Sequence, residues 1–340
     1  MKIFTIWATL LVLLLIIIFP IALMVGRYDI SANVFYDIIL GGSGAHPMES
    51  SIIFNLRVPR TCIAAIAGAA LSVSGLIYQE TFRNPLVSPD LLGVTSGASV
   101  GAASAIVIGM ATLMVSLFAF LAGIVAVVLT IAVSRIFRSR SSAVLVLSGI
   151  FVGGFMGACL SLIKYFADPE STLADITFWL MGSCASAVML DVWILLVSVL
   201  PCIIILMMIG WRINIVSLGR EEAQTRGINY NHYRNGIIVL STFMTACAVS
   251  FVGTIGWVGL VVPHIVRLML GDKLGSDARK TIPLTALFGA IFIVVADVVS
   301  RTFTSAEIPL GVITGVSGIA VFIAIIAFRR RAGSEINMHE

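Results

Sequence analysis

The sequence predicts an all-α polytopic membrane protein with about ten transmembrane helices. Hydrophobic residues make up 59% of the 340 positions and charged residues 11%, against about 25% charged in a typical soluble domain. The mean hydropathy is +1.09. Segments such as TLLVLLLIIIF and LFGAIFIVVA are apolar on every side, whereas the strands of a transmembrane barrel alternate apolar and polar residues. Composition therefore excludes a soluble globule and favours helices over a barrel.

Ten apolar runs are candidate spans, each near the roughly 20 residues that cross a bilayer. They lie near residues 3–25, 61–78, 92–110, 113–133, 143–165, 192–211, 236–252, 256–270, 282–300 and 311–328. No cleavage site of small residues follows the first run, so we expect it to stay as a span. Three connections are long, at 26–57, 166–191 and 212–235. None leaves room for a soluble domain, and residues 1–340 are expected to form one transmembrane domain.

Basic residues predict the orientation of the chain. An even number of spans places both termini on one side, and positively charged loops stay in the cytoplasm. With both termini cytoplasmic, most of the 21 lysines and arginines, including the terminal FRRRAGS, fall inside. The external side keeps Arg27, Arg57, Arg60, Lys164 and Arg301. The net charge of +4 thus reflects orientation and not nucleic-acid binding.

Two parts of the chain are similar to each other. GAALSVSGLIYQETFRNPLVSPDLLGVTSGAS from Gly68 and GAIFIVVADVVSRTFTSAEIPLGVITGVSG from Gly289 share Thr-Phe, Pro and Leu-Gly-Val in the same order. The first turn would be cytoplasmic and the second external, so the copies would be inverted, as in many transporters. Chance similarity between two apolar segments is the alternative.

Small residues recur four apart in two of these spans. Such spacing places them on one helix face, where two helices can approach closely. Tight helix packing and the lining of a transport path are both compatible with this pattern. The candidates are Gly93, Ser96, Gly97, Gly101, Gly311 and Gly315.

Charged residues near the external helix ends form two patterns. Asp297 and Arg301 are one helical turn apart, which predicts local pairing. The motif LRVPR places Arg57 and Arg60 at a helix entrance. Arginines there anchor a helix to lipid headgroups or bind carboxylates of an acidic partner. The residues alone leave both readings open.

The internal connection SLGREEAQTRGIN, residues 217–229, has helix-forming residues between Gly219 and Gly227. It is either a solvated helix or the docking helix of an internal partner. No GxxxxGK[ST] phosphate loop or HExxH metal site occurs, and the five cysteines lie singly with no CxxC spacing. A membrane enzyme is therefore disfavoured. A transport path would need energy from an ion gradient or from another subunit.

Five motifs together resemble the FecCD family, the permease subunits of iron-chelate, haem and cobalamin ABC importers. They are LRVPRT, RNPLVSPDLLGVTSGASVGA, LGREEAQTRGI, GTIGWVGLVVPHIVRLMLG and ADVVSRTFTSAEIPLGVITGVSG, in family order between about residues 50 and 328. The resemblance implies a permease paired with a second permease subunit in a prokaryotic cytoplasmic membrane. It also implies two cytoplasmic ATPases, which hold the ATP and magnesium, and an extracytoplasmic binding protein. No cofactor or metal site is expected in this chain.

The resemblance also assigns residues. Arg57, Arg60 and Arg301 match arginines that meet acidic residues of the binding protein. The residues that match the ATPase-coupling helix are Gly219, Arg220, Glu221, Glu222, Ala223 and Gly227. FWLMGS, residues 178–183, resembles an external half-helix that acts as a gate. The NPLVSPDLLGVTSGA motif looks more like ferric siderophore permeases than cobalamin permeases. Haem is a further alternative for the substrate. The competing class of protein is an ion-coupled secondary transporter.

Overall fold

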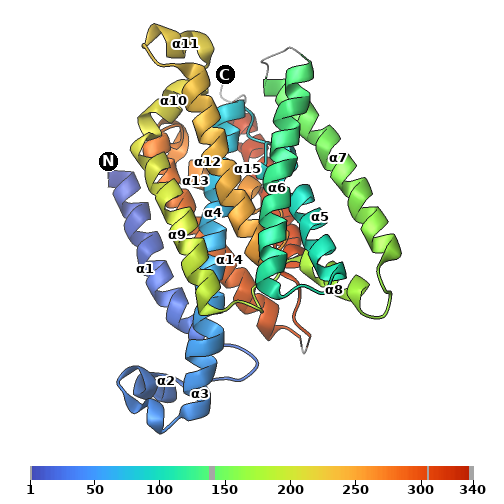
Figure 1. Cartoon of the computed structure of the whole chain (residues 1–340). Helices are drawn as coiled ribbons and strands as arrows, with labels where there is room; N and C mark the ends of the chain where they lie inside the picture. Colours follow the sequence, from blue (N-terminus) through green and yellow to red (C-terminus); the bar gives the residue numbers. More distant parts are fainter. Residues whose placement is uncertain (1, 138–141, 305, 337–340) are drawn as a thin grey trace.

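The computed structural model describes residues 2–137, 142–304 and 306–336, and this part of the chain is a bundle of helices without strands (Figure 1). The long helices are α1 Lys2–Met24, α4 Val58–Phe82, α5 Val94–Val107, α6 Thr112–Ile136, α7 Ser142–Phe166, α9 Met189–Met208, α12 Tyr230–Val252, α13 Val258–Gly275, α14 Ala278–Thr302 and α15 Leu310–Ile336. Each of the ten predicted spans corresponds to one of them. Within these described residues, seven helices are long and apolar enough to cross a membrane, and α5, α13 and the apolar part of α15 are shorter.

Short helices fill the three long connections, and two of them, α8 Thr172–Met181 and α11 Arg220–Thr225, lie where a half-helix and a connecting helix were expected. The connection at 26–57 folds into α2 Ala32–Ile39, η1 Gly42–Gly44, α3 Pro47–Ser51 and η2 Ile52–Arg57, and 212–235 contains part of α10 Gly210–Leu218 and all of α11. Helix α8 precedes α9, and η3 Pro89–Leu92 precedes α5. Their apolar runs are too short or too interrupted to register as spans, so hydropathy missed them.

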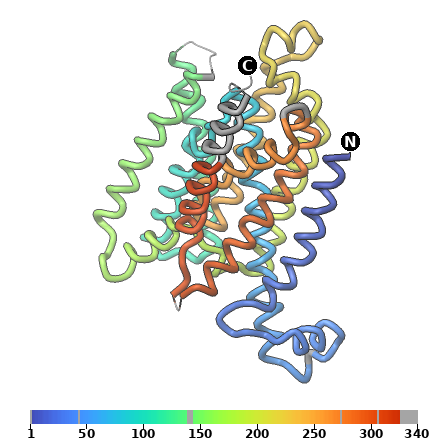
Figure 2. Tube along the Cα trace, turned by 180° about the vertical axis from the view of Figure 1, so that it is seen from behind, coloured from blue at the N-terminus to red at the C-terminus, as the bar shows by residue number. Residues whose placement is uncertain are grey.

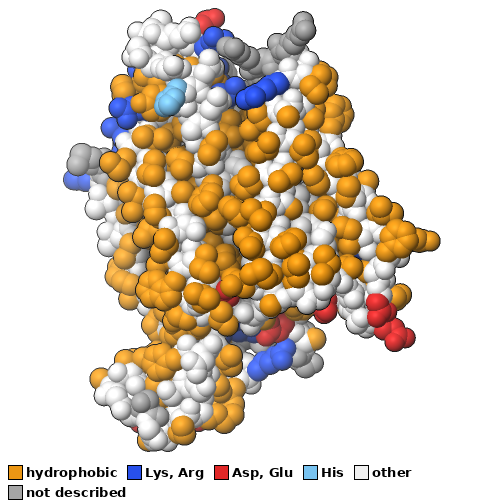
Figure 3. Space-filling model, in the orientation of Figure 1, with side chains coloured by type: hydrophobic (Ala, Val, Ile, Leu, Met, Phe, Trp, Pro, Cys, Tyr) orange, Lys and Arg blue, Asp and Glu red, His pale blue; other side chains and the backbone are white. Residues whose placement is uncertain are grey.

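The two ends of the bundle differ in charge. Helix α1 begins toward the end of the bundle that carries α11, and α2 and α3 form a lobe at the opposite end (Figures 1 and 2). Most of the lysine and arginine side chains visible in Figure 3 lie at the α11 end, and most visible acids lie at the other end. This distribution fits the cytoplasmic side expected for α11, and the two ends are called cytoplasmic and external below.

Helix α4 is the centre of the bundle. Its most apolar window is 78% buried, against 17% for α1 and 22% for α7, which stand at opposite edges (Figure 2). Small residues such as Ala64, Ala67, Gly68 and Gly75 are fully or nearly fully buried on α4, so α9, α12, α13 and α14 can pack closely around it. The exposed leucines and isoleucines of α1 form part of the apolar belt seen in Figure 3.

Candidate functional site

A buried group of charges, here called the external cluster, joins α4, α14 and the connection to α15. Arg60 Nε donates to Asp297 Oδ1 at 2.7 Å, and Arg60 Nη1 donates to Glu307 Oε1 at 3.0 Å. Arg301 Nε lies 3.5 Å from Asp297 Oδ2, one turn along the helix. Arg60, Asp297 and Arg301 are buried, and the Glu307 side chain is 22% exposed. The predicted Asp297–Arg301 pair is therefore confirmed, and two partners were missed.

The remaining arginine, Arg57, fastens the end of α1. Its guanidinium donates to the carbonyl oxygens of Leu23 at 2.8 Å, Met24 at 2.7 Å and Tyr28. Arg301 Nη2 likewise donates to Ala22 O at 2.6 Å. Buried side chains with these internal partners do not anchor the protein to headgroups. Docking of a partner at Arg57, Arg60 and Arg301 stays a prediction, and it requires one of these contacts to open.

The gate-like segment at 178–183 covers the end of α8 and the two residues after it, and three hydrogen bonds hold it. Ser183 N donates to Val252 O at 2.9 Å, and Thr254 Oγ1 donates to Leu180 O. Leu310 N donates to Gly182 O at 3.0 Å. Glycines allow this close approach, because a Cβ at Gly311 would lie 2.6 Å from Met181 O. The end of α8 is thus tied to the α12–α13 connection and to the start of α15.

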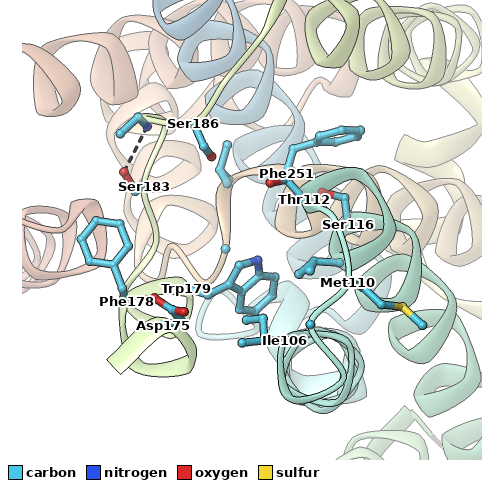
Figure 4. Close-up of a pocket in the computed structure, with 15 residues that line it drawn as sticks. Ile106, Met110, Thr112, Ser116, Asp175, Phe178, Trp179, Ser183, Ser186 and Phe251 are labelled. Atoms are coloured by element: carbon cyan, nitrogen blue, oxygen red, sulfur yellow. Dashed lines mark hydrogen bonds between the residues drawn. The ribbon is translucent and has the colours of Figure 1, made fainter. Parts of the chain in front are cut away.

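A cavity of about 480 Å³ opens beside α8. The α5–α6 turn, the end of α12 and residues 183–186 complete its wall. Figure 4 shows Trp179 of α8 in this cavity next to Ile106, with the hydroxyl-bearing Thr112 and Ser116 on another side. Among the described residues that line it, Asp175 alone carries a charged side chain. The lining suits apolar and hydrogen-bonding groups rather than an anion.

The small residues predicted on α5 serve helix packing. A Cβ at Gly97 would lie 2.5 Å from Ala126 Cβ, and one at Gly101 would lie 2.6 Å from Ala122 Cβ, both on α6. Gly93 has a positive φ of 77° at the start of α5, a conformation that favours glycine. Gly315 and Ser96 are only partly buried. The structure thus brings Gly97 and Gly101 to a helix contact and leaves path lining by the other small residues as a prediction.

The predicted coupling residues form a projecting turn at the cytoplasmic end (Figure 1). Helix α11 buries Ala223 and exposes Arg220, Glu221 and Glu222. Gly219 and Gly227 have positive φ angles of 112° and 71° at its two ends. The glycines therefore turn the chain sharply into and out of α11, and its charged side faces outward.

Two contacts fasten this turn to the bundle, and the sequence analysis identified neither. Arg83 Nε, at the end of α4, donates to Ser217 O at 2.7 Å. Asn214 Nδ2 donates to Asp277 Oδ1 at 2.9 Å, and Asn214 Oδ1 accepts from Ala278 N at 2.7 Å. Burial alone would raise the pKa of Asp277, but hydrogen bonds from Arg279 and Asn214 lower that pKa to about 2. Coupling region and core helices are thus linked by charge-assisted hydrogen bonds.

All five cysteines are free. Within the described residues no group of three or more His, Cys, Asp or Glu side chains could hold a metal ion.

Comparisons with known proteins agree with one another. The FecCD transport family matches residues 13–328. The chain is 36% identical to the Molybdate import system permease protein MolB of Haemophilus influenzae, over 95% of this chain and 96% of that protein. It is 38% identical to the "Probable iron chelatin transport system permease protein" of Helicobacter pylori, over 83% and 84% of the two chains.

A solved structure has the same fold. It is described as "An inward-facing conformation of a putative metal-chelate type ABC transporter", and it matches with a TM-score of 0.84 and 34% sequence identity. The match covers 94% of this chain and 98% of the solved one. Sequence and structure therefore point to the same group of proteins.

Proposed function

The chain belongs to the FecCD transport family, and we propose that it is the permease through which an ATP-binding cassette importer moves a metal complex into the cell. The chain is a multi-pass protein of the prokaryotic cytoplasmic membrane. In this proposal ATP hydrolysis outside the chain alternately opens the path to the two sides. The permease itself performs no chemical step.

The projecting α11 is the observation that carries the proposal. It exposes Arg220, Glu221 and Glu222 beyond the bundle, and Arg83 and Asn214 tie its base to α4 and α14. A cytoplasmic partner that binds such a turn can displace it, and these contacts transmit the displacement to the bundle. The sequence has no P-loop of its own. We assign ATP and magnesium to two separate ATPase subunits, one of which docks on α11 of this chain.

A second permease subunit is proposed to complete the path. Helix α7 stands at the edge of the bundle, and no atom lies within 4 Å of where a Cβ of Gly154 or Gly157 would be. Small residues on an outward face let another helix pack closely. An identical chain or a related permease fits this face equally. Cross-linking at α7, followed by identification of the linked chains, distinguishes a homodimer from a heterodimer.

For the substrate we place an iron(III)–siderophore complex first. The NPLVSPDLLGVTSGA motif resembles that branch of the family, and one relative is named for iron chelatin transport. Haem and cobalamin are alternatives within the family, and the relative named for molybdate import adds an oxyanion. Iron would cross inside its chelator, so the proposal needs no metal ligands in this chain.

The experiment purifies the chain with its ATPase and binding-protein partners and measures ATP hydrolysis. We expect the binding protein to stimulate hydrolysis. Its affinity is then measured for a ferric hydroxamate, a ferric catecholate, haem, cobalamin and molybdate. Tight binding of a ferric siderophore supports the first assignment. Preference for molybdate would move the chain to oxyanion import while leaving the permease role intact.

A further inference from the structure

Glu307 has the most exposed side chain of the external cluster. Its side chain is 22% exposed, whereas those of Arg60 and Asp297 are 10% and 1% exposed. It lies on the connection between α14 and α15, while Arg60 lies on α4, 247 residues away in sequence. The Arg60–Glu307 contact therefore closes the cluster at its outer side.

The charges of this cluster balance only while Glu307 is in place. Arg60 and Arg301 face Asp297 and Glu307, and Arg57 is held separately by backbone carbonyls. Loss of the Glu307 carboxylate would leave a buried arginine without full compensation, which is strongly unfavourable. Glu307 can leave Arg60 at low cost only if another carboxylate takes its place.

The same stretch of chain holds the end of α8. Ser300 Oγ donates to Ile308 O at 2.5 Å, and Leu310 N donates to Gly182 O at 3.0 Å. Leu310 follows Glu307 by only three positions. Movement of Glu307 away from Arg60 therefore shifts the backbone that fixes the gate-like end of α8.

We propose that Glu307 is an internal latch, which occupies Arg60 until a carboxylate of the external binding protein displaces it. The exchange keeps the buried cluster neutral and frees residues 307–310, so that docking outside loosens α8. This inference rests on the proposed function, because it requires a docking partner. It makes Glu307 a positioning residue, which acts on α8 through the backbone.

The test compares Glu307→Gln with wild type in the full transporter in nanodiscs. The probe is the purified binding protein without substrate. Because Gln competes less well for Arg60, we expect about tenfold tighter docking and faster amide hydrogen exchange in residues 172–188 before the binding protein is added. In wild type the same exchange should rise only after docking. Glu307→Asp, which keeps the charge on a shorter side chain, should fall between the two.

Glu170→Gln is the matched control, because Glu170 is an exposed external acid near α8 and outside the cluster. It should leave docking and exchange at wild-type values. Unchanged or weaker docking of Glu307→Gln, with wild-type docking intact, would overturn the latch. Absence of docking in wild type would instead remove the proposed function, and the latch with it.

Discussion

Gly68 of α4 and Gly289 of α14 face each other at a helix crossing, each against the other's backbone. A Cβ at Gly289 would lie 2.5 Å from Gly68 O, and one at Gly68 would overlap Gly289 O. These are the first residues of the two similar segments, and their helices run in opposite directions across the bundle. Reciprocal contact between equivalent residues is what a two-fold axis through the crossing produces. It supports the predicted inverted repeat.

Adding a methyl group at this crossing should loosen the bundle. We expect Gly68→Ala or Gly289→Ala to destabilise the protein by about 1–3 kcal/mol, the usual range for an overpacked core. Thermal unfolding of the detergent-solubilised protein measures the effect. Gly236→Ala on α12 is the control, since no atom lies within 4 Å of its Cβ position. Equal melting temperatures for all three variants would contradict a close crossing.

Removing the charge of Asp297 alone should destabilise the protein more than removing the charges of Asp297 and Arg301 together. Asp297→Asn leaves Arg60 and Arg301 facing a single carboxylate, and breaking a buried ion pair costs about 3–5 kcal/mol. The double variant Asp297→Asn with Arg301→Gln restores the balance between Arg60 and Glu307. We therefore expect it to melt above the single variant. A double variant less stable than Asp297→Asn would show that charge balance does not stabilise the cluster.

Hydropathy located the ten long helices because each contains a continuous apolar run. It missed α8 and η3, since short helices inside a protein need no such run. Local spacing also predicted the Asp297–Arg301 pair, one turn apart. It could not find Arg60–Asp297 or Asn214–Asp277, which join residues 237 and 63 positions apart. These pairs form only because particular helices pack against each other. The spacing of polar residues within one helix does not show which helices are neighbours.

Helix α11 should transmit the movement of the ATPase subunit to the bundle through its buried face. Ala223 is fully buried, so Ala223→Glu places a charge against the base of the coupling turn. We expect ATP hydrolysis to persist in the assembled transporter while uptake falls at least about tenfold, or the ATPase to dissociate. Uptake and hydrolysis are measured in the same proteoliposomes. Gln224→Glu, an exposed change on the same helix, should remain coupled, and normal uptake by Ala223→Glu would contradict the assignment.

The Asp277 carboxylate should make the free energy of unfolding depend on pH. Its pKa is about 2 in the folded protein and about 3.9 in an unfolded chain. Because the folded pKa is the lower one, its stabilisation is complete above about pH 5 and declines as the pH falls toward 2. The full contribution is on the order of 2 kcal/mol.

Asp277→Asn isolates this charge, because Asn also caps a helix N-terminus well. The melting temperature of Asp277→Asn should lie below that of wild type at pH 7, and the difference should shrink at pH 3. A difference independent of pH would show that the carboxylate charge does not fasten Asn214 to α14.

The energy source of transport is the most direct test of the central claim. Proteoliposomes containing the chain, its permease partner and the ATPase subunits are supplied with the binding protein and a radiolabelled ferric siderophore. We expect uptake only when ATP is on the side of α11 and the ATPase subunits are present, with no uptake driven by a proton or sodium gradient alone. Gradient-driven uptake by the permease without ATPase subunits would contradict the account.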